Sequence, residues 1–108
     1  MDDELRALRR QFYADLRETT DRMEALLLEL ERGATDAESL RSLFRAFHTV
    51  KGNAGLVGEA EIQEVCHAYE SRWSEARPDL LPAGLVQDSL EVVDLLGAVA
   101  EAGSTEAH

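Results

Sequence analysis

The chain has 108 residues, enough for one domain with one hydrophobic core. Its 22 acidic and 11 basic side chains leave a formal net charge of −11, which argues against a nucleic-acid-binding protein and against an anionic membrane surface as a partner. Hydrophobic residues make up 44% of the sequence, so a packed core can form, and a protein partner fits the acidic charge better.

Cys66 is the only cysteine, so no disulfide can form within the chain. No apolar run approaches 18 residues, which argues against a membrane-spanning helix. The N-terminal sequence Met1-Asp2-Asp3-Glu4 has the wrong charge for a secretion signal. We therefore expect a cytoplasmic protein.

Apolar residues recur with helical period through most of the chain, and no segment shows the alternation typical of a strand. A first helix is expected from about Asp3 to Arg32, with Gly33 as the residue that ends it. The apolar stripe predicted for this helix comprises Leu5, Leu8, Phe12, Leu16, Thr19, Met23, Leu26, Leu27 and Leu30.

A second helix is expected to begin at a capping box, in which Thr35 accepts a hydrogen bond from the backbone N–H of Glu38 and the Glu38 side chain reaches back. Gly55 or Gly58 is expected to end this helix. Its predicted apolar positions are Leu40, Leu43, Phe44, Phe47, Val50 and Ala54.

A third helix is expected from about Glu59, with Pro78 closing the element, and a fourth from Pro82 to a stop at Gly103. Residues 1–103 then form one domain and residues 104–108 a disordered tail. The predicted stripes are Ile62, Val65, Cys66, Tyr69 and Trp73 in the third helix, and Leu85, Val86, Leu90, Val93, Leu96 and Val99 or Ala100 in the fourth.

These patterns predict an all-α protein, an antiparallel up-down four-helix bundle. No single helix can bury its own apolar stripe, and four helices joined by short connections enclose one core.

His48 is the candidate reactive residue. At ~100° per residue, Phe47 lies near the middle of the apolar stripe of the second helix and His48 lies on its flank. Lys51 is a surface neighbour three residues on, and Gly52 follows one turn after His48. Because a neutral imidazole is nucleophilic near pH 7 and an ammonium offsets phosphoryl charge, this position suits a phosphoryl carrier.

Gly52 and Gly55 each cost a helix roughly 1 kcal/mol relative to alanine, which indicates a steric reason for them. Three reasons are open: the close approach of another protein, a helix end, or a tight helix–helix contact.

Glu70 is the candidate orienting residue. It lies on the flank of the third helix, about 100° from Tyr69, and His67 lies three residues earlier. If the second and third helices are antiparallel neighbours, the flanks that carry His48 and Glu70 can meet. A carboxylate on one imidazole nitrogen then fixes the tautomer and leaves the other nitrogen free to attack.

The segment 44–55, FRAFHTVKGNAG, resembles the signature of histidine-phosphotransfer domains, His-x-x-Lys-Gly followed by a small residue, Ala and Gly. Over roughly residues 11–100 the chain is most similar to the phosphotransfer domain at the N-terminus of chemotaxis (CheA-type) histidine kinases. The run His67-Ala68-Tyr69-Glu70 matches the His-x-x-Glu of that subtype. The subtype often carries a further C-terminal helix, and the printed sequence leaves room for a short one only.

The resemblance implies that His48 is phosphorylated on Nε2, with Glu70 on Nδ1. It also implies that Lys51, His67 and Glu70 form a hydrogen-bonded network around the imidazole.

No glycine-rich nucleotide loop or ATP-site motif is present, so a separate kinase domain, in the same or another chain, would bind ATP and phosphorylate His48. The resemblance implies that a response-regulator receiver domain then takes the phosphoryl group onto an aspartate, with Mg²⁺ held by the receiver. The domain itself would hold no cofactor and would be a fragment of a protein histidine kinase. We expect the receiver to dock over the second helix and part of the first, at Arg45, His48, Lys51, Gly52 and Gly55.

Two other functions stay open. One is a helical interaction module in which His48 is inert. The other is a small hydrolase that uses His48 and Glu70 as a catalytic pair, and this one requires a pocket. The spacing of Cys66, His67 and His48 matches no standard zinc ligand set, so we expect no metal site and a buried Cys66 thiol.

Overall fold

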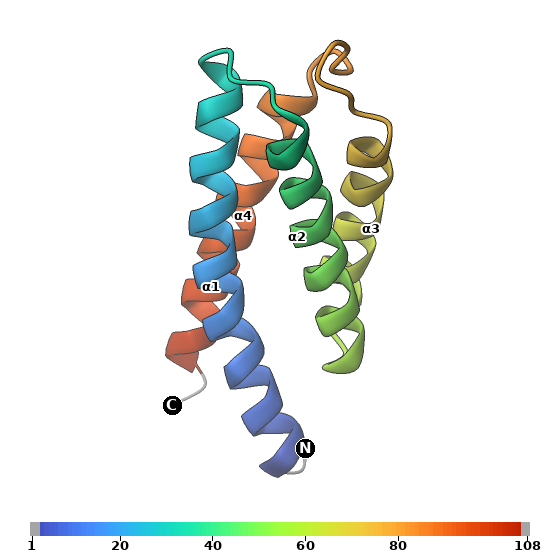
Figure 1. Cartoon of the computed structure of the whole chain (residues 1–108). Coiled ribbons are helices and arrows are strands. Elements are labelled where there is room, and N and C mark those ends of the chain that lie inside the picture. The colour runs from blue at the N-terminus through green and yellow to red at the C-terminus, as the bar shows by residue number, and fades with distance from the viewer. Residues whose placement is uncertain (1–2, 107–108) are drawn as a thin grey trace.

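The computed structural model describes residues 3–106, which form four helices and no strand: α1 (Asp3–Glu31), α2 (Ala37–Leu56), α3 (Ala60–Ser74) and α4 (Leu85–Glu106). Successive helices run in opposite directions along an elongated bundle, with α1 beginning and α4 ending at the same end (Figure 1). α1 packs mainly against α4, and α2 packs mainly against α3. The predicted all-α, up-down four-helix bundle is confirmed.

One core runs between the four helices, and its largest fully buried side chains include Trp73, Phe47, Leu16, Met23, Leu27, Leu43 and Leu85. Two positions of the α1 stripe differ from the prediction. Leu8 is exposed because the first turns of α1 reach beyond the end of α2 (Figure 1). Thr20, not Thr19, is buried, and its hydroxyl donates a hydrogen bond to the carbonyl of Arg17.

The predicted capping box at Thr35 is wrong. Asp36 is the N-cap residue of α2, and no side chain caps the helix. Instead, Asp36 Oδ1 accepts a hydrogen bond of 2.6 Å from the Ser39 hydroxyl, and this bond lowers the pKa of Asp36. Threonine and aspartate are both N-cap residue types, so the sequence alone could not choose between the two adjacent positions.

Gly33 and Gly58 end α1 and α2 in Schellman motifs. Both glycines have positive φ, +103° and +79°, a conformation that side chains rarely adopt. The N–H of Glu59 donates to the carbonyl of Ala54 at 2.8 Å, which closes the motif after α2 and turns the chain back along α2. The predicted end at Gly33 is confirmed, and Gly58 rather than Gly55 ends α2.

Arg9 ties α1 to the turn that joins α2 and α3. Its Nε donates to the carbonyl of Val57 at 3.0 Å, and its guanidinium pairs with the Glu59 carboxylate at 3.2 Å. Because Val57 is the C-cap residue of α2, this bond satisfies a carbonyl that the helix leaves without an internal partner.

α4 differs from its predicted bounds at both ends. It begins at Leu85, after a turn in which Gly84 has a positive φ, and it continues to Glu106. The predicted stop at Gly103 is therefore wrong: residues 104–106 belong to the helix, and residues 107–108 of the expected tail lie outside the described residues. Gly103 is buried against the ring of Tyr13, where an added Cβ would lie 2.6 Å from ring carbons.

One further apolar position was wrongly assigned to the core: Val65 of α3 is exposed. Of the two alternatives predicted for α4, Ala100 is buried and Val99 is exposed. Ser89 of α4 is fully buried and accepts a hydrogen bond of 2.9 Å from Trp73 Nε1, which satisfies the indole inside the core. None of the helices in the described part of the chain has both the length and the apolar character needed to cross a membrane.

Candidate functional site

The packing of α2 against α3 brings His48, Lys51 and Glu70 together. His48 Nδ1 is hydrogen-bonded to Glu70 Oε2, and Lys51 Nζ donates to Glu70 Oε1 at 2.6 Å. Each oxygen of one carboxylate from α3 thus has a different partner on α2. These are three of the four residues that the resemblance placed in a network.

The three side chains differ in depth. The exposed fraction is 62% for His48, 22% for Lys51 and 12% for Glu70. Glu70 lies deeper than its expected flank position, because α3 buries Ile62, Cys66, Glu70 and Trp73 on one stripe. A carboxylate at that depth requires partners, and His48 and Lys51 supply them.

The Lys51 ammonium, hydrogen-bonded to Glu70, lowers the pKa of that carboxyl group. Burial acts in the opposite direction, and the hydrogen bond with His48 lowers the pKa further. Glu70 is therefore ionised at neutral pH and can only accept hydrogen bonds. Because Nδ1 then carries the proton of the neutral imidazole, the lone pair of the ring is on Nε2.

Phe44 is part of the site although the sequence placed it only in the apolar stripe. Its ring is stacked on the His48 imidazole, with 6.3 Å between the ring centroids and 15° between the planes. Its position four residues before His48, on the same side of the helix, is the signal that could have identified it.

The two candidate glycines of α2 have different surroundings. A Cβ added at Gly52 would meet nothing within 4 Å, so the space beside it is open. A Cβ added at Gly55 would lie 2.6 Å from Nε2 of Gln63 on α3. Gly55 thus leaves room for the end of the Gln63 side chain, whereas Gly52 leaves an open approach next to His48.

His67 is not brought together with the other three site residues. It is exposed on α3, and no hydrogen bond or ion pair joins it to His48 or Glu70 within residues 3–106. Arg45 is exposed on α2, three residues before His48.

Cys66 lies one turn before Glu70 on the buried face of α3 and is fully buried. Burial, with a smaller contribution from the charge of Glu70, raises the pKa of the Cys66 thiol to about 12. Among the described residues, no group of three or more His, Cys, Asp or Glu side chains is arranged to hold a metal ion.

The family model described as "Hpt domain" matches residues 7–102, which is most of the chain. The chain belongs to the Hpt domain family. The resemblance seen in the segment 44–55 is therefore confirmed across the whole four-helix bundle.

The Hpt domain is similar to curated proteins named chemotaxis protein CheA. It is 36% identical over 84 residues to the protein from Salmonella typhimurium (78% of this chain, 12% of the relative). It is 33% identical over 98 residues to that from Klebsiella aerogenes (89% and 15%) and 35% identical over 77 residues to that from Halobacterium salinarum (71% and 11%). The chain spans only about an eighth of the length of these relatives. No solved structure matches it at a comparable level of significance.

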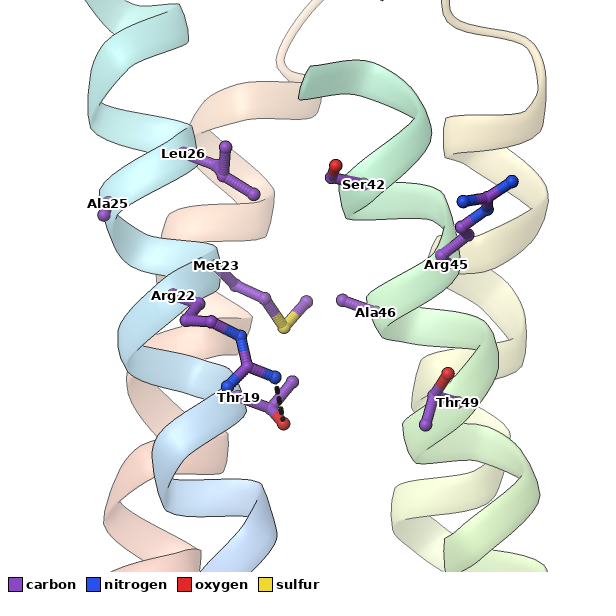
Figure 2. A pocket seen from close by; sticks show the side chains of 9 residues that line it. All are labelled: Thr19, Arg22, Met23, Ala25, Leu26, Ser42, Arg45, Ala46 and Thr49. Carbon is purple, nitrogen blue, oxygen red and sulfur yellow. Dashed lines mark hydrogen bonds between the residues drawn. The ribbon is translucent and has the colours of Figure 1, made fainter. Parts of the chain in front are cut away.

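Two grooves flank the exposed side of α2 in the Hpt domain. The groove between α1 and α2 is drawn in Figure 2, where Met23 and Ala46 face each other across it. The groove between α2 and α3 is lined in part by Arg41, Phe44 and Pro78. His48 lines neither of these grooves, and its imidazole stands exposed between them.

Proposed function

We propose that this Hpt domain is a cytoplasmic phosphoryl relay in chemotaxis-type two-component signalling. His48 accepts a phosphoryl group on Nε2 from a histidine kinase domain and donates it to an aspartate of a receiver domain. The observation that carries the proposal is the hydrogen bond between His48 Nδ1 and the ionised carboxylate of Glu70, because it leaves the lone pair of a largely exposed ring on Nε2.

In the first transfer, the Nε2 lone pair forms a bond to the γ-phosphorus of ATP while the bond from phosphorus to the ADP oxygen breaks. The proton stays on Nδ1, so the ring gains positive charge as the new bond forms. Glu70 faces that proton, and its negative charge stabilises the charged ring. In the second transfer, the Nε2–P bond breaks as the receiver aspartate attacks, and the ring becomes neutral again.

Lys51 supports both transfers. Its ammonium group has three N–H donors, and the contact with Glu70 Oε1 uses one of them. The remaining donors are available to a phosphoryl group on His48, which lies one turn away on the same side of the helix. Lys51 thus holds Glu70 in place and offsets part of the phosphoryl charge.

We place ATP on the kinase domain and Mg²⁺ on the receiver. In this proposal the Hpt domain supplies only the imidazole and the residues that orient it. The relatives are chemotaxis proteins far longer than the matched segment, which supports a longer parent chain that carries the kinase domain.

The test begins with a partner-free reaction. The purified chain is incubated with phosphoramidate, a small donor that needs no docking surface, and phosphohistidine is measured as acid-labile, base-stable phosphate. We expect wild type to be labelled and His48→Gln not to be labelled, with unchanged circular dichroism. Labelling of His48→Gln at the wild-type level would refute the proposal.

The loaded domain is then mixed with each receiver domain of the parent cell, and transfer is measured at short times. We expect rapid transfer to one or a few receivers. If no receiver accepts the phosphoryl group, the interaction module with an inert His48 becomes the better description.

A further inference from the structure

In this acidic chain, α2 carries an excess of basic over acidic residues. That helix contains Arg41, Arg45 and Lys51 but only one acidic residue, Glu38. α4, which among the described residues packs against α1 and α3 but not against α2, contains five acidic residues and no lysine or arginine. α2 is the only one of the four helices with a net positive charge.

Three arginines, two on α2 and one across its groove with α1, are also left without an acidic partner. Within residues 3–106, Arg22, Arg41 and Arg45 form no ion pair, and Arg22 donates only to the hydroxyl of Thr19. The exposed arginines elsewhere differ: Arg17 pairs with Glu101 and Arg32 with Glu29. In a chain with two acidic residues for each basic one, three unpaired arginines on α2 and along its groove with α1 leave uncompensated charge available to a partner.

The charged residues that line the grooves are also distributed unevenly around the bundle. Each is lined by two arginines and by no acidic residue: Arg22 and Arg45 in the α1/α2 groove, Arg41 and Arg77 in the α2/α3 groove. The groove between α1 and α4 is the reverse, with one arginine and the acidic residues Asp21, Glu24, Asp94 and Glu101. The molecule therefore has a cationic side at α2 and an anionic side at α1/α4.

The cationic side coincides with the exposed imidazole. Arg45 precedes His48 by three residues and Arg41 by seven, so all three project from the same side of α2. In Figure 2 the Arg45 side chain extends from α2 away from α1, and Arg22 lies across the groove on α1. A protein that covers His48 and the open space at Gly52 therefore lies next to Arg41 and Arg45 on the same side of α2.

We propose that Arg22, Arg41 and Arg45, here called the cationic face, dock an acidic surface of the receiver domain that takes the phosphoryl group from His48. The inference rests on the proposed function and adds the chemistry of the partner surface. Uncompensated charges around a docking site act mainly on the association rate, because they attract and orient the partner before contact. The anionic side of the bundle disfavours binding in the wrong orientation.

The test compares the double variant Arg41→Glu, Arg45→Glu with the control Arg17→Glu, Arg32→Glu. Both change the net charge equally, and the control residues are exposed arginines whose surface ion pairs contribute little to stability. Each protein is loaded with phosphoramidate and its loaded fraction is measured. The second-order rate of transfer, per loaded chain, is then measured to the receiver that accepts fastest from wild type.

We expect the Arg41/Arg45 variant to transfer at least about tenfold more slowly than wild type at low ionic strength. The difference should shrink at ~1 M salt, where the Debye length falls to about 3 Å. We expect the control variant to transfer at the wild-type rate. Equal rates for the two double variants would overturn the docking inference while leaving the relay intact.

Two other outcomes are informative. Failure of wild type itself to load or to transfer would refute the proposed function, and the docking inference with it. Binding of wild type, but not of the Arg41/Arg45 variant, to vesicles containing phosphatidylserine would assign the cationic face to a membrane and overturn its assignment to a protein.

Discussion

His48 on α2 and Glu70 on α3 are hydrogen-bonded across the helix pair, although 22 residues separate them in the sequence. The acceptor is a nearly buried carboxylate, and the donor is the inner nitrogen of a largely exposed ring. This arrangement holds the imidazole by one nitrogen and presents the other. Lys51 donates a hydrogen bond to the second oxygen of the Glu70 carboxylate.

We predict that Glu70→Ala slows the loading of His48 by phosphoramidate by about 10- to 100-fold, the rate equivalent of one charge-assisted hydrogen bond of about 1.5–3 kcal/mol. The initial rate of phosphohistidine formation measures the effect, and circular dichroism checks the fold. Glu64→Ala, at an exposed position of the same helix, is the control and should load like wild type. Equal rates for the two variants would show that Glu70 does not orient His48.

The lowered pKa of Glu70 predicts a dependence of stability on acid pH. Since the pKa in the folded state lies below its ordinary value of 4.5, ionised Glu70 stabilises the fold fully above that pH. The contribution is lost as the pH falls through the lowered value. Urea unfolding of wild type and Glu70→Gln should therefore differ at pH 7, and the difference should vanish in stronger acid. A difference that grows as the pH falls would contradict the assignment.

Lys51→Met is expected to raise the pKa of Glu70 in the folded domain, because the Lys51 hydrogen bond is the largest cause of its lowered value. Without it, burial raises that pKa, and acid unfolding should begin at a higher pH than in wild type. Acid titration followed by circular dichroism measures the midpoint. An exposed control, Arg32→Met, should leave the midpoint unchanged.

The glycines in two helices should respond oppositely to alanine. Gly52→Ala is expected to raise the free energy of unfolding by about 0.5–1 kcal/mol, because the new methyl group meets open space and alanine favours the helix. Gly103→Ala is expected to lower it by about 1–3 kcal/mol, because the methyl group would collide with the Tyr13 ring. Urea unfolding compares the two, and a gain of stability for Gly103→Ala would contradict the packing of α4 on α1.

The Cys66 thiol is predicted to be unreactive in the folded domain. Burial raises its pKa to about 12, so almost no thiolate is present at pH 8. We expect iodoacetamide to modify Cys66 only in urea, as measured by mass spectrometry with and without denaturant. Rapid modification of the folded chain would show that α3 opens beneath the site.

Several features of the domain were predictable from the sequence because they depend on short-range rules. The spacing of apolar residues predicted four helices, and Gly33 predicted the end of α1, since a left-handed residue is needed there. The segment around His48 and Lys51 indicated the imidazole and the ammonium that share the Glu70 carboxylate. All of these relationships lie within one helix or one turn.

The remaining features were decided only by how the helices pack. Glu70 is buried between His48 and Lys51, and His67 lies outside their contacts, because the rotation of α3 about its axis depends on its neighbours. Gly103 ended no helix; it accommodates Tyr13 from a segment 90 positions earlier in the chain. A helical period fixes angles around one axis and leaves the rotation of each helix against the next undetermined. The candidate reactive residue could therefore be named from the sequence, while the depth and contacts of its carboxylate partner required the folded bundle.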